Sequence, residues 1–218
     1  LGVKKEVTGL NTDGFVPVHE IFMGHGYRAH YNVGAMKASG NAVSALFNKL
    51  DALSDGDILI LAGSIPSSLP SDIYEQILAR LSDKKIKAVV DATGELLLNV
   101  LKYKPFLVKP NNHELGEMFG VELSSDEDIE KYARRLQDMG AVNVLISMAG
   151  EGAMLIDGQG RTHRSGACRG KVKNSVGAGD SMVAGFVAGS LSKDYEYALK
   201  LGTAAGGATA FSEGLATK

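Results

Sequence analysis

"NSVGAGDS", residues 174–181, lies between a lysine-rich approach and an apolar run of small residues at 182–190 that is typical of a buried helix. A Gly-Ala-Gly turn that leads straight into a helix leaves the first backbone N–H groups of that helix without partners. Those groups and the positive end of the helix dipole attract anions, and glycine lets a phosphate approach the backbone closely. The stretch therefore predicts an anion site formed by the N–H groups of Gly177, Ala178 and Gly179.

Asp180 follows this turn directly and lies in the first turn of the expected helix. A carboxylate beside a bound phosphate can accept the proton of an alcohol that attacks a phosphoryl group, so Asp180 is a candidate general base. The plainer alternative is a helix N-terminus with a favourable first-turn acid. The spacing fits neither the P-loop pattern nor the dinucleotide-binding pattern, which excludes both of those sites for this stretch.

Composition narrows the class of protein. The chain has 218 residues, a net charge of -2 and one cysteine, Cys168. That charge argues against a general binder of nucleic acid or anionic membranes, and one cysteine excludes a disulfide framework or a cysteine-based zinc site. The sequence has no apolar run of about 20 residues and no basic-then-apolar signal segment at its start. We therefore expect a cytoplasmic protein that binds neither nucleic acid nor membranes.

From residue 41 onward, apolar segments with strand character alternate with amphipathic ones. Strands are predicted at 57–63, 86–92, 105–110, 141–148 and 152–157, with a polar edge piece at 160–166. Helices are predicted at about 42–53, 71–81, 94–103, 112–120, 124–140, 179–190 and 195–211. This alternation predicts an α/β fold with a mostly parallel sheet covered by helices on both faces. Ligands of such sheets bind at the carboxyl ends of the strands.

The first forty residues show no clear period for a helix or a strand. His25 and His30 are five residues apart, which does not place them on one helix face, and no acid or thiol is spaced to complete a metal site. We expect exposed loop histidines there, a poorly defined segment at 1–40 and a core at 41–218.

The stretch from Asn174 to Gly189 resembles the C-terminal signature of the ribokinase-like sugar kinases, in the phosphofructokinase B group. Further blocks lie in the order and at about the spacing of that family: "LAGSIPSSLP" at 61–70, "KPNNHELGEMFG" at 109–120, "ISMAGEGAML" at 146–155 and "GTAAGGATAFSEG" at 202–214. Within the family they are most similar to the 1-phosphofructokinases, with the tagatose-6-phosphate kinases next. The resemblance implies a three-layer ribokinase-like fold.

The resemblance also implies an activity, namely ATP-dependent phosphorylation of a sugar phosphate, most simply D-fructose 1-phosphate. Such kinases hold the sugar with an earlier segment and close a small β lid, sometimes shared in a homodimer. That sugar-holding segment is absent here, so residues 1–40 are expected to be remnants of a lid or an incomplete segment. Without the sugar-holding segment, an alternative is that the chain is a non-catalytic, ligand-binding protein with the same fold.

Asn111 and Glu114 form an Asn-x-x-Glu pair at the start of a predicted helix, directly after a strand. A spacing of three residues places both side chains on one helix face. The same pattern is typical of a helix cap followed by a first-turn acid, which is the plainer alternative. The resemblance implies that the pair organises phosphate-bound Mg²⁺ through water. Lys109 faces either phosphate or solvent.

The remaining candidates follow strands or lie on the last helix. Ser147, Gly150 and Gly152 are implied to line the nucleotide, although the family pattern Ser-Leu-Gly-x-x-Gly has its first glycine where this chain has Ala149. The alternative for these residues is an ordinary hairpin turn. By resemblance, Gly207 and Phe211 lie near adenine, and Gly63 and Ser64 lie near the sugar. Asp91 also ends a strand, where a structural turn acid is the alternative.

Overall fold

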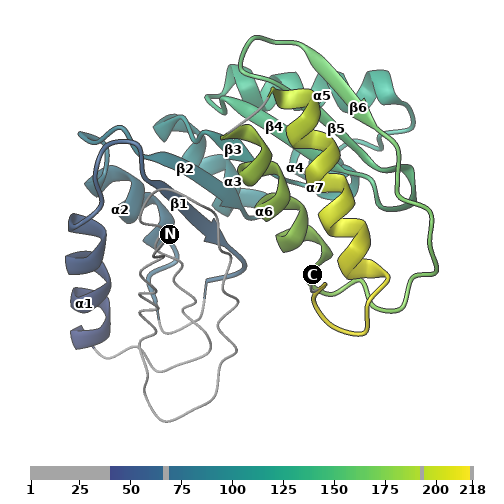
Figure 1. The fold of residues 1–218 in the computed structure, drawn as a ribbon. Coiled ribbons are helices and arrows are strands. Elements are labelled where there is room, and N and C mark those ends of the chain that lie inside the picture. The colour runs from purple at the N-terminus through teal and green to yellow at the C-terminus, as the bar shows by residue number, and fades with distance from the viewer. Residues whose placement is uncertain (1–39, 66–68, 192–193, 217–218) are drawn as a thin grey trace.

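One six-stranded sheet organises the computed structural model, which describes residues 40–65, 69–191 and 194–216 (Figure 1). The strands lie in the sheet in the order of the sequence. β1 (Ile58–Ala62), β2 (Lys87–Asp91), β3 (Leu107–Val108) and β4 (Asn143–Ser147) are parallel. β5 (Ala153–Ile156) and β6 (Thr162–Ser165) continue the sheet antiparallel. The prediction of a mostly parallel sheet is therefore confirmed.

Helices cover both faces of this sheet, as predicted. They are α1 (Gly40–Asp51), α2 (Ile73–Arg80), α3 (Gly94–Val100), α4 (Asn112–Phe119), α5 (Asp126–Asp138), α6 (Ala178–Ser190) and α7 (Tyr195–Ala210), with short 3-10 turns at Leu101–Tyr103 and Ala149–Glu151. The largest differences from the predicted bounds are at 105–110, where only Leu107–Val108 pairs as a strand, and at 94–103, where the helix ends in a 3-10 turn.

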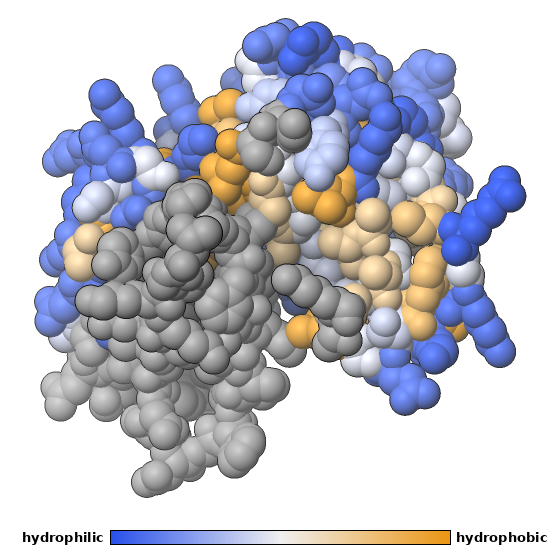
Figure 2. Space-filling model, in the orientation of Figure 1, coloured by the Kyte–Doolittle hydropathy of each residue, from blue (hydrophilic) through white to orange (hydrophobic). Residues whose placement is uncertain are grey.

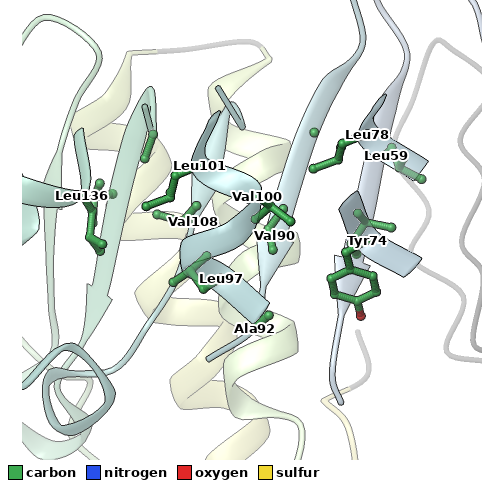
Figure 3. Close-up of a cluster of buried hydrophobic side chains, with 14 of the residues drawn as sticks. Leu59, Tyr74, Leu78, Val90, Ala92, Leu97, Val100, Leu101, Val108 and Leu136 are labelled. Carbon is green, nitrogen blue, oxygen red and sulfur yellow. The ribbon is translucent and has the colours of Figure 1, made fainter. Parts of the chain in front are cut away.

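Alternate residues of each strand enter two hydrophobic cores, as the period of a strand requires. Val89, Leu107 and Leu145 pack on one face against α6 and α7. Their neighbours Val90 and Val108 pack on the other face, and Figure 3 shows these two beside Leu97 and Val100 of α3. Burying one such side chain completely contributes roughly 1.5–3 kcal/mol. Because the strands are apolar on both sides, helices must cover both faces of the sheet, which gives a three-layer fold.

α6 and α7 approach each other backbone to backbone, because glycines lie where they cross. A Cβ on Gly185 would come within 2.7 Å of the Leu201 carbonyl oxygen, and one on Gly202 within 2.8 Å of the Met182 carbonyl oxygen. The outer face of this helix pair is rich in alanine and glycine, and Figure 2 shows it as weakly hydrophobic. The close packing fixes the position of the first turn of α6 relative to α7.

The expectations about the lid and about membrane spans can be compared only with the residues that the structure describes. The predicted lid, His25 and His30 lie outside the described residues. Among the helices that the structure describes, none is long and apolar enough to cross a membrane.

Candidate active site

The predicted site residues gather where the parallel strands end. Gly63 and Ser64 follow β1, Asp91 ends β2, and Lys109 follows β3. Ser147 ends β4 and pairs with Asn111 in an isolated parallel bridge. Carboxyl ends of parallel strands share one edge of a sheet, so these residues line a single region.

Asp91 and Lys109 form a buried ion pair at the centre of this edge. The Lys109 Nζ lies 3.1 Å from Asp91 Oδ1, and the two side chains are 8% and 16% exposed. The register that pairs Val90 with Val108 makes Asp91 and Lys109 direct neighbours. Lys109 was expected to face phosphate or solvent, and the solvent alternative is wrong because its side chain is enclosed.

Burial raises the pKa of the Asp91 carboxyl group. Lys109 opposes this rise, whereas the nearby charges of Asp180 and Glu114 add to it. The charges of Glu114 on α4 and Asp180 on α6 thus act on Asp91 of β2, which is paired with the buried Lys109.

The start of α6 has the free donors that an anion site needs. Gly177 is the N-cap residue with φ 79°, a left-handed conformation that favours glycine. No side chain caps this helix, and the N–H groups of Gly177, Gly179 and Asp180 donate to no group of the described chain. Of the three N–H groups predicted to form the site, that of Ala178 instead donates to the Ser175 carbonyl oxygen at 3.1 Å.

The first turn of α6 lies against the buried ion pair. A Cβ on Gly179 would come within 3.4 Å of the Lys109 Nζ, so glycine leaves room there for the ammonium group. Asp180, one residue further, has an exposed side chain. Free N–H groups, a buried cation and an exposed carboxylate therefore meet at one place, which suits an anion that reacts with a polar partner.

Asn111 and Glu114 form a complete capping box at the start of α4. The Glu114 N–H donates to Asn111 Oδ1 at 2.8 Å, and the Asn111 N–H donates to Glu114 Oε2 at 2.7 Å. The plainer alternative for this pair, a helix cap, is therefore confirmed. Glu114 Oε1 has no hydrogen-bond partner in the described chain, so it is available to accept a hydrogen bond from water.

A five-residue turn after β4 carries the next candidates. The Ser147 N–H donates to the Pro110 carbonyl oxygen at 3.2 Å. A hydrogen bond of 2.8 Å from the Met148 N–H to the Gly152 carbonyl oxygen closes the turn. Gly152 has φ 93°, and a Cβ there would lie 2.0 Å from the Ser165 carbonyl oxygen. β4 and β5 are antiparallel, so the hairpin alternative is confirmed, and Gly152 is required by the backbone alone.

The end of α7 lies beside the start of α6. Ser181 and Thr209 share a hydrogen bond of 2.8 Å between their hydroxyl groups. Gly207 and Phe211 lie along the same stretch, where Gly207 faces Cys168 and the Phe211 ring packs on the backbone of Gly170. The structure thus packs both residues against the loop at 168–170, and their proposed place near adenine stays a prediction.

Tyr74 is a residue near the site that the sequence analysis did not single out. Its hydroxyl group donates to the carbonyl oxygens of Ala62 and Gly63, at 2.9 and 3.2 Å, and holds the end of β1. Burial raises the pKa of Tyr74 to about 12, with a contribution from the Asp91 carboxylate. Its position after a proline-containing loop gave no signal of this contact.

Among the described residues, no cluster of three or more histidine, cysteine or acidic side chains is arranged to hold a metal ion. A metal at this edge would therefore take part of its coordination from water and from a bound anion, as Mg²⁺ commonly does.

Comparisons with known proteins bear on the identity of the chain. The model of the pfkB family of carbohydrate kinases matches residues 29–218. A 1-phosphofructokinase of Bacillus subtilis is 48% identical over 175 residues, which are 80% of this chain and 57% of that protein. A D-tagatose-1-phosphate kinase of Bacillus licheniformis is 39% identical over 172 residues, 78% of this chain and 56% of that protein.

A provisionally assigned phosphofructokinase from Staphylococcus aureus has a similar crystal structure, with a TM-score of 0.78 and 43% sequence identity. The match covers 83% of this chain and 59% of that one. The chain therefore spans less than two thirds of the length of each of these relatives.

Proposed function

The chain belongs to the pfkB family of carbohydrate kinases, and on that premise we propose that it transfers the γ-phosphoryl group of ATP to D-fructose 1-phosphate. The products are ADP and fructose 1,6-bisphosphate. One observation carries this proposal: the uncapped, glycine-rich start of α6, with the exposed Asp180 in its first turn, lies against the buried Lys109. Two of the curated relatives that the chain matches are named 1-phosphofructokinase, which supports the choice of fructose 1-phosphate.

In this mechanism Asp180 accepts the proton of the sugar hydroxyl group as its oxygen attacks the γ-phosphorus. The bond between the γ-phosphorus and the bridging oxygen breaks, and ADP leaves with that oxygen. The free N–H groups of Gly177 and Gly179 stabilise the charge on the transferring phosphoryl oxygens. Lys109 adds a positive charge beneath them, since its ammonium group lies against Gly179.

Asn111 and Glu114 fit a water-mediated Mg²⁺ site, because Glu114 Oε1 has no partner in the described chain. When bound there, Mg²⁺ would neutralise phosphate charge. The capping box keeps both oxygen-bearing side chains fixed at the site edge.

The other substrate groups are assigned by the resemblance. Ser147, Gly150 and Gly152 would face the nucleotide phosphates, Gly207 and Phe211 would lie near adenine, and Gly63 and Ser64 would lie near the sugar. The same proposal includes a cytoplasmic location and a homodimer. The curated relatives include a D-tagatose-1-phosphate kinase. The alternative substrate that we propose is therefore D-tagatose 1-phosphate instead of the 6-phosphate.

A coupled assay of ADP release tests the proposal on a panel of fructose 1-phosphate, fructose 6-phosphate, tagatose 1-phosphate and tagatose 6-phosphate. We expect the highest kcat/KM with fructose 1-phosphate. A preference for tagatose 1-phosphate would support the alternative substrate. ATP binding without ADP release on any sugar would overturn the proposed activity and favour a non-catalytic binding protein.

A further inference from the structure

Arg164 joins the turn after β4 to the start of α5. Its Nη1 donates to the Glu151 carbonyl oxygen at 2.7 Å, and its Nε donates to Asp126 Oδ2 at 2.9 Å. The guanidinium group also reaches the carbonyl oxygens of Ala153 and Ser165, at 3.5 and 3.3 Å. Asp126 is the first residue of α5, so one side chain from β6 ties the turn to a rigid helix.

The turn that Arg164 holds contains an unfavourable backbone conformation. Ala149 has φ 44°, and only one other non-glycine residue of the described chain has a positive φ. Such a conformation costs a residue with a Cβ free energy, and it persists where surrounding contacts over-determine it. Hydrogen bonds from Glu151 N–H to Met148 and from Gly152 N–H to Ala149 close the turn from inside, and Arg164 fixes it from outside.

We propose that Arg164 is a positioning residue for nucleotide binding, which rests on the proposed function of the 147–152 turn. It holds the turn in the strained conformation that receives the nucleotide phosphates, without touching them itself. Removing the guanidinium group frees the Glu151 carbonyl and lets Ala149 relax to negative φ. The fraction of molecules competent to bind nucleotide then falls, and the apparent affinity falls by the same factor.

Arg134 of α5 offers a matched control at the β5–β6 turn, which lies at the other end of β5 from Glu151. Its Nη1 donates to the Gly160 carbonyl oxygen at 2.9 Å, and its Nη2 donates to Glu130 of α5 at 2.7 Å. Both arginines therefore pair with an acid of α5 and donate to a backbone carbonyl group, Arg134 from within α5 and Arg164 from β6. Only Arg164 does so beside the proposed nucleotide turn.

The test compares Arg164→Ala, Arg164→Lys and Arg134→Ala by calorimetric titration with ATP and by denaturant unfolding. We expect both alanine variants to lose similar stability. ATP binding should weaken about tenfold in Arg164→Ala, partly recover in Arg164→Lys, and stay within twofold of the wild type in Arg134→Ala. In turnover assays the KM for ATP should rise in Arg164→Ala while that for the sugar phosphate stays unchanged.

Ala149→Gly tests the link to backbone strain, because glycine adopts the left-handed conformation freely. In that background Arg164→Ala should weaken ATP binding by about threefold only. Unchanged ATP affinity in Arg164→Ala, or an equal loss in Arg134→Ala, would overturn the inference and leave the proposed function intact. A wild-type chain that binds no ATP would instead overturn the proposed function, and this inference with it.

Discussion

Lys109 is the residue whose role the structure changes most. A buried ammonium group at the positive end of a helix is unfavourable by itself, so its charge must be balanced. Asp91 balances it, and Asp91 is in turn close to Asp180 and Glu114. This lysine therefore offsets the repulsion between Asp91 and the nearby acidic side chains, and removing it leaves a mostly buried carboxylate without a partner.

Lys109→Met should accordingly lower the free energy of unfolding by about 3 kcal/mol, the usual cost of breaking a buried ion pair. Adding Asp91→Asn should recover part of that loss, since the unpaired charge is then gone. Denaturant unfolding of both variants measures this. The control is Lys102→Met, because the exposed Lys102 pairs with a half-buried Glu75 and this pair should contribute less than about 1 kcal/mol. Equal losses in Lys109→Met and Lys102→Met would contradict the assignment.

Single residues differ in how well the sequence predicts their contacts. The three-residue spacing of Asn111 and Glu114 predicts a shared helix face, and the structure places both in one capping box. The pairing of Asp91 with Lys109 was not predicted, because it depends on the register between β2 and β3. Sequence spacing carries no direct information on that register, and β3 is too short to show a clear pattern.

At the scale of elements, the α6–α7 pair supports the site from behind. Its glycines allow the helices to touch. A Cβ on Gly206 would lie 3.0 Å from the Ala178 carbonyl oxygen, at the level of the anion site. A side chain in this contact would move the first turn of α6, which carries the free N–H groups.

Gly202→Ala tests the tightness of that contact. The added methyl group meets a backbone carbonyl oxygen at 2.8 Å, so we expect a loss of about 2 kcal/mol in the free energy of unfolding, typical of overpacking. Helix propensity alone predicts the opposite, a gain of about 1 kcal/mol, and a stabilised variant would disprove the packing argument. The control is Ala204→Gly, exposed on the same helix, which should cost about 1 kcal/mol.

The β5–β6 turn is stabilised by one buried carboxylate. Asp157 accepts hydrogen bonds from the N–H groups of Gln159 and Arg161, from the Arg161 side chain and from His163. Burial alone would raise the pKa of Asp157, but the bonds from His163 and Arg161 outweigh it and hold the pKa well below its usual range. A depressed pKa in the folded state contributes stability above the unfolded-state pKa of about 3.9, and that stability declines as the pH falls below it.

Asp157→Asn should therefore cost about 2 kcal/mol at pH 7, the range of hydrogen bonds to a charged group. The difference from the wild type should shrink below about pH 4, because the wild type also loses this contribution there. Urea unfolding at pH 7 and pH 3 measures the change. The matched control is Asp138→Asn, since Asp138 is exposed and its carboxylate makes no hydrogen bond in the described chain. A difference that stays constant with pH would argue against the ionised carboxylate as the cause.

For the whole molecule, the sequence predicted the α/β class, the parallel sheet and most helices, because apolar patterning and glycine-containing turns are local signals. It also predicted that site residues share one sheet edge. The Arg164 and Tyr74 contacts were missed, since each joins groups that are separated in sequence and meet only after folding. The strain at Ala149 was also missed, although the family pattern has glycine at this position.

The proposed activity depends on the start of α6, where we propose that free backbone N–H groups hold a phosphate and that Asp180 takes a proton. Asp180 is exposed and makes no hydrogen bond through its carboxylate in the described chain, so replacing it should leave the fold intact. The same substitution should remove the general base and little else.

Turnover of Asp180→Asn with ATP and fructose 1-phosphate is the most direct measurement, taken together with ATP affinity and unfolding. We predict that kcat falls by about 10³ or more, within the range of general-base catalysis, while ATP affinity and stability change little. A variant that retains kcat within about tenfold of the wild type, a change of about 1.4 kcal/mol in the barrier, would contradict the role of Asp180 as the general base.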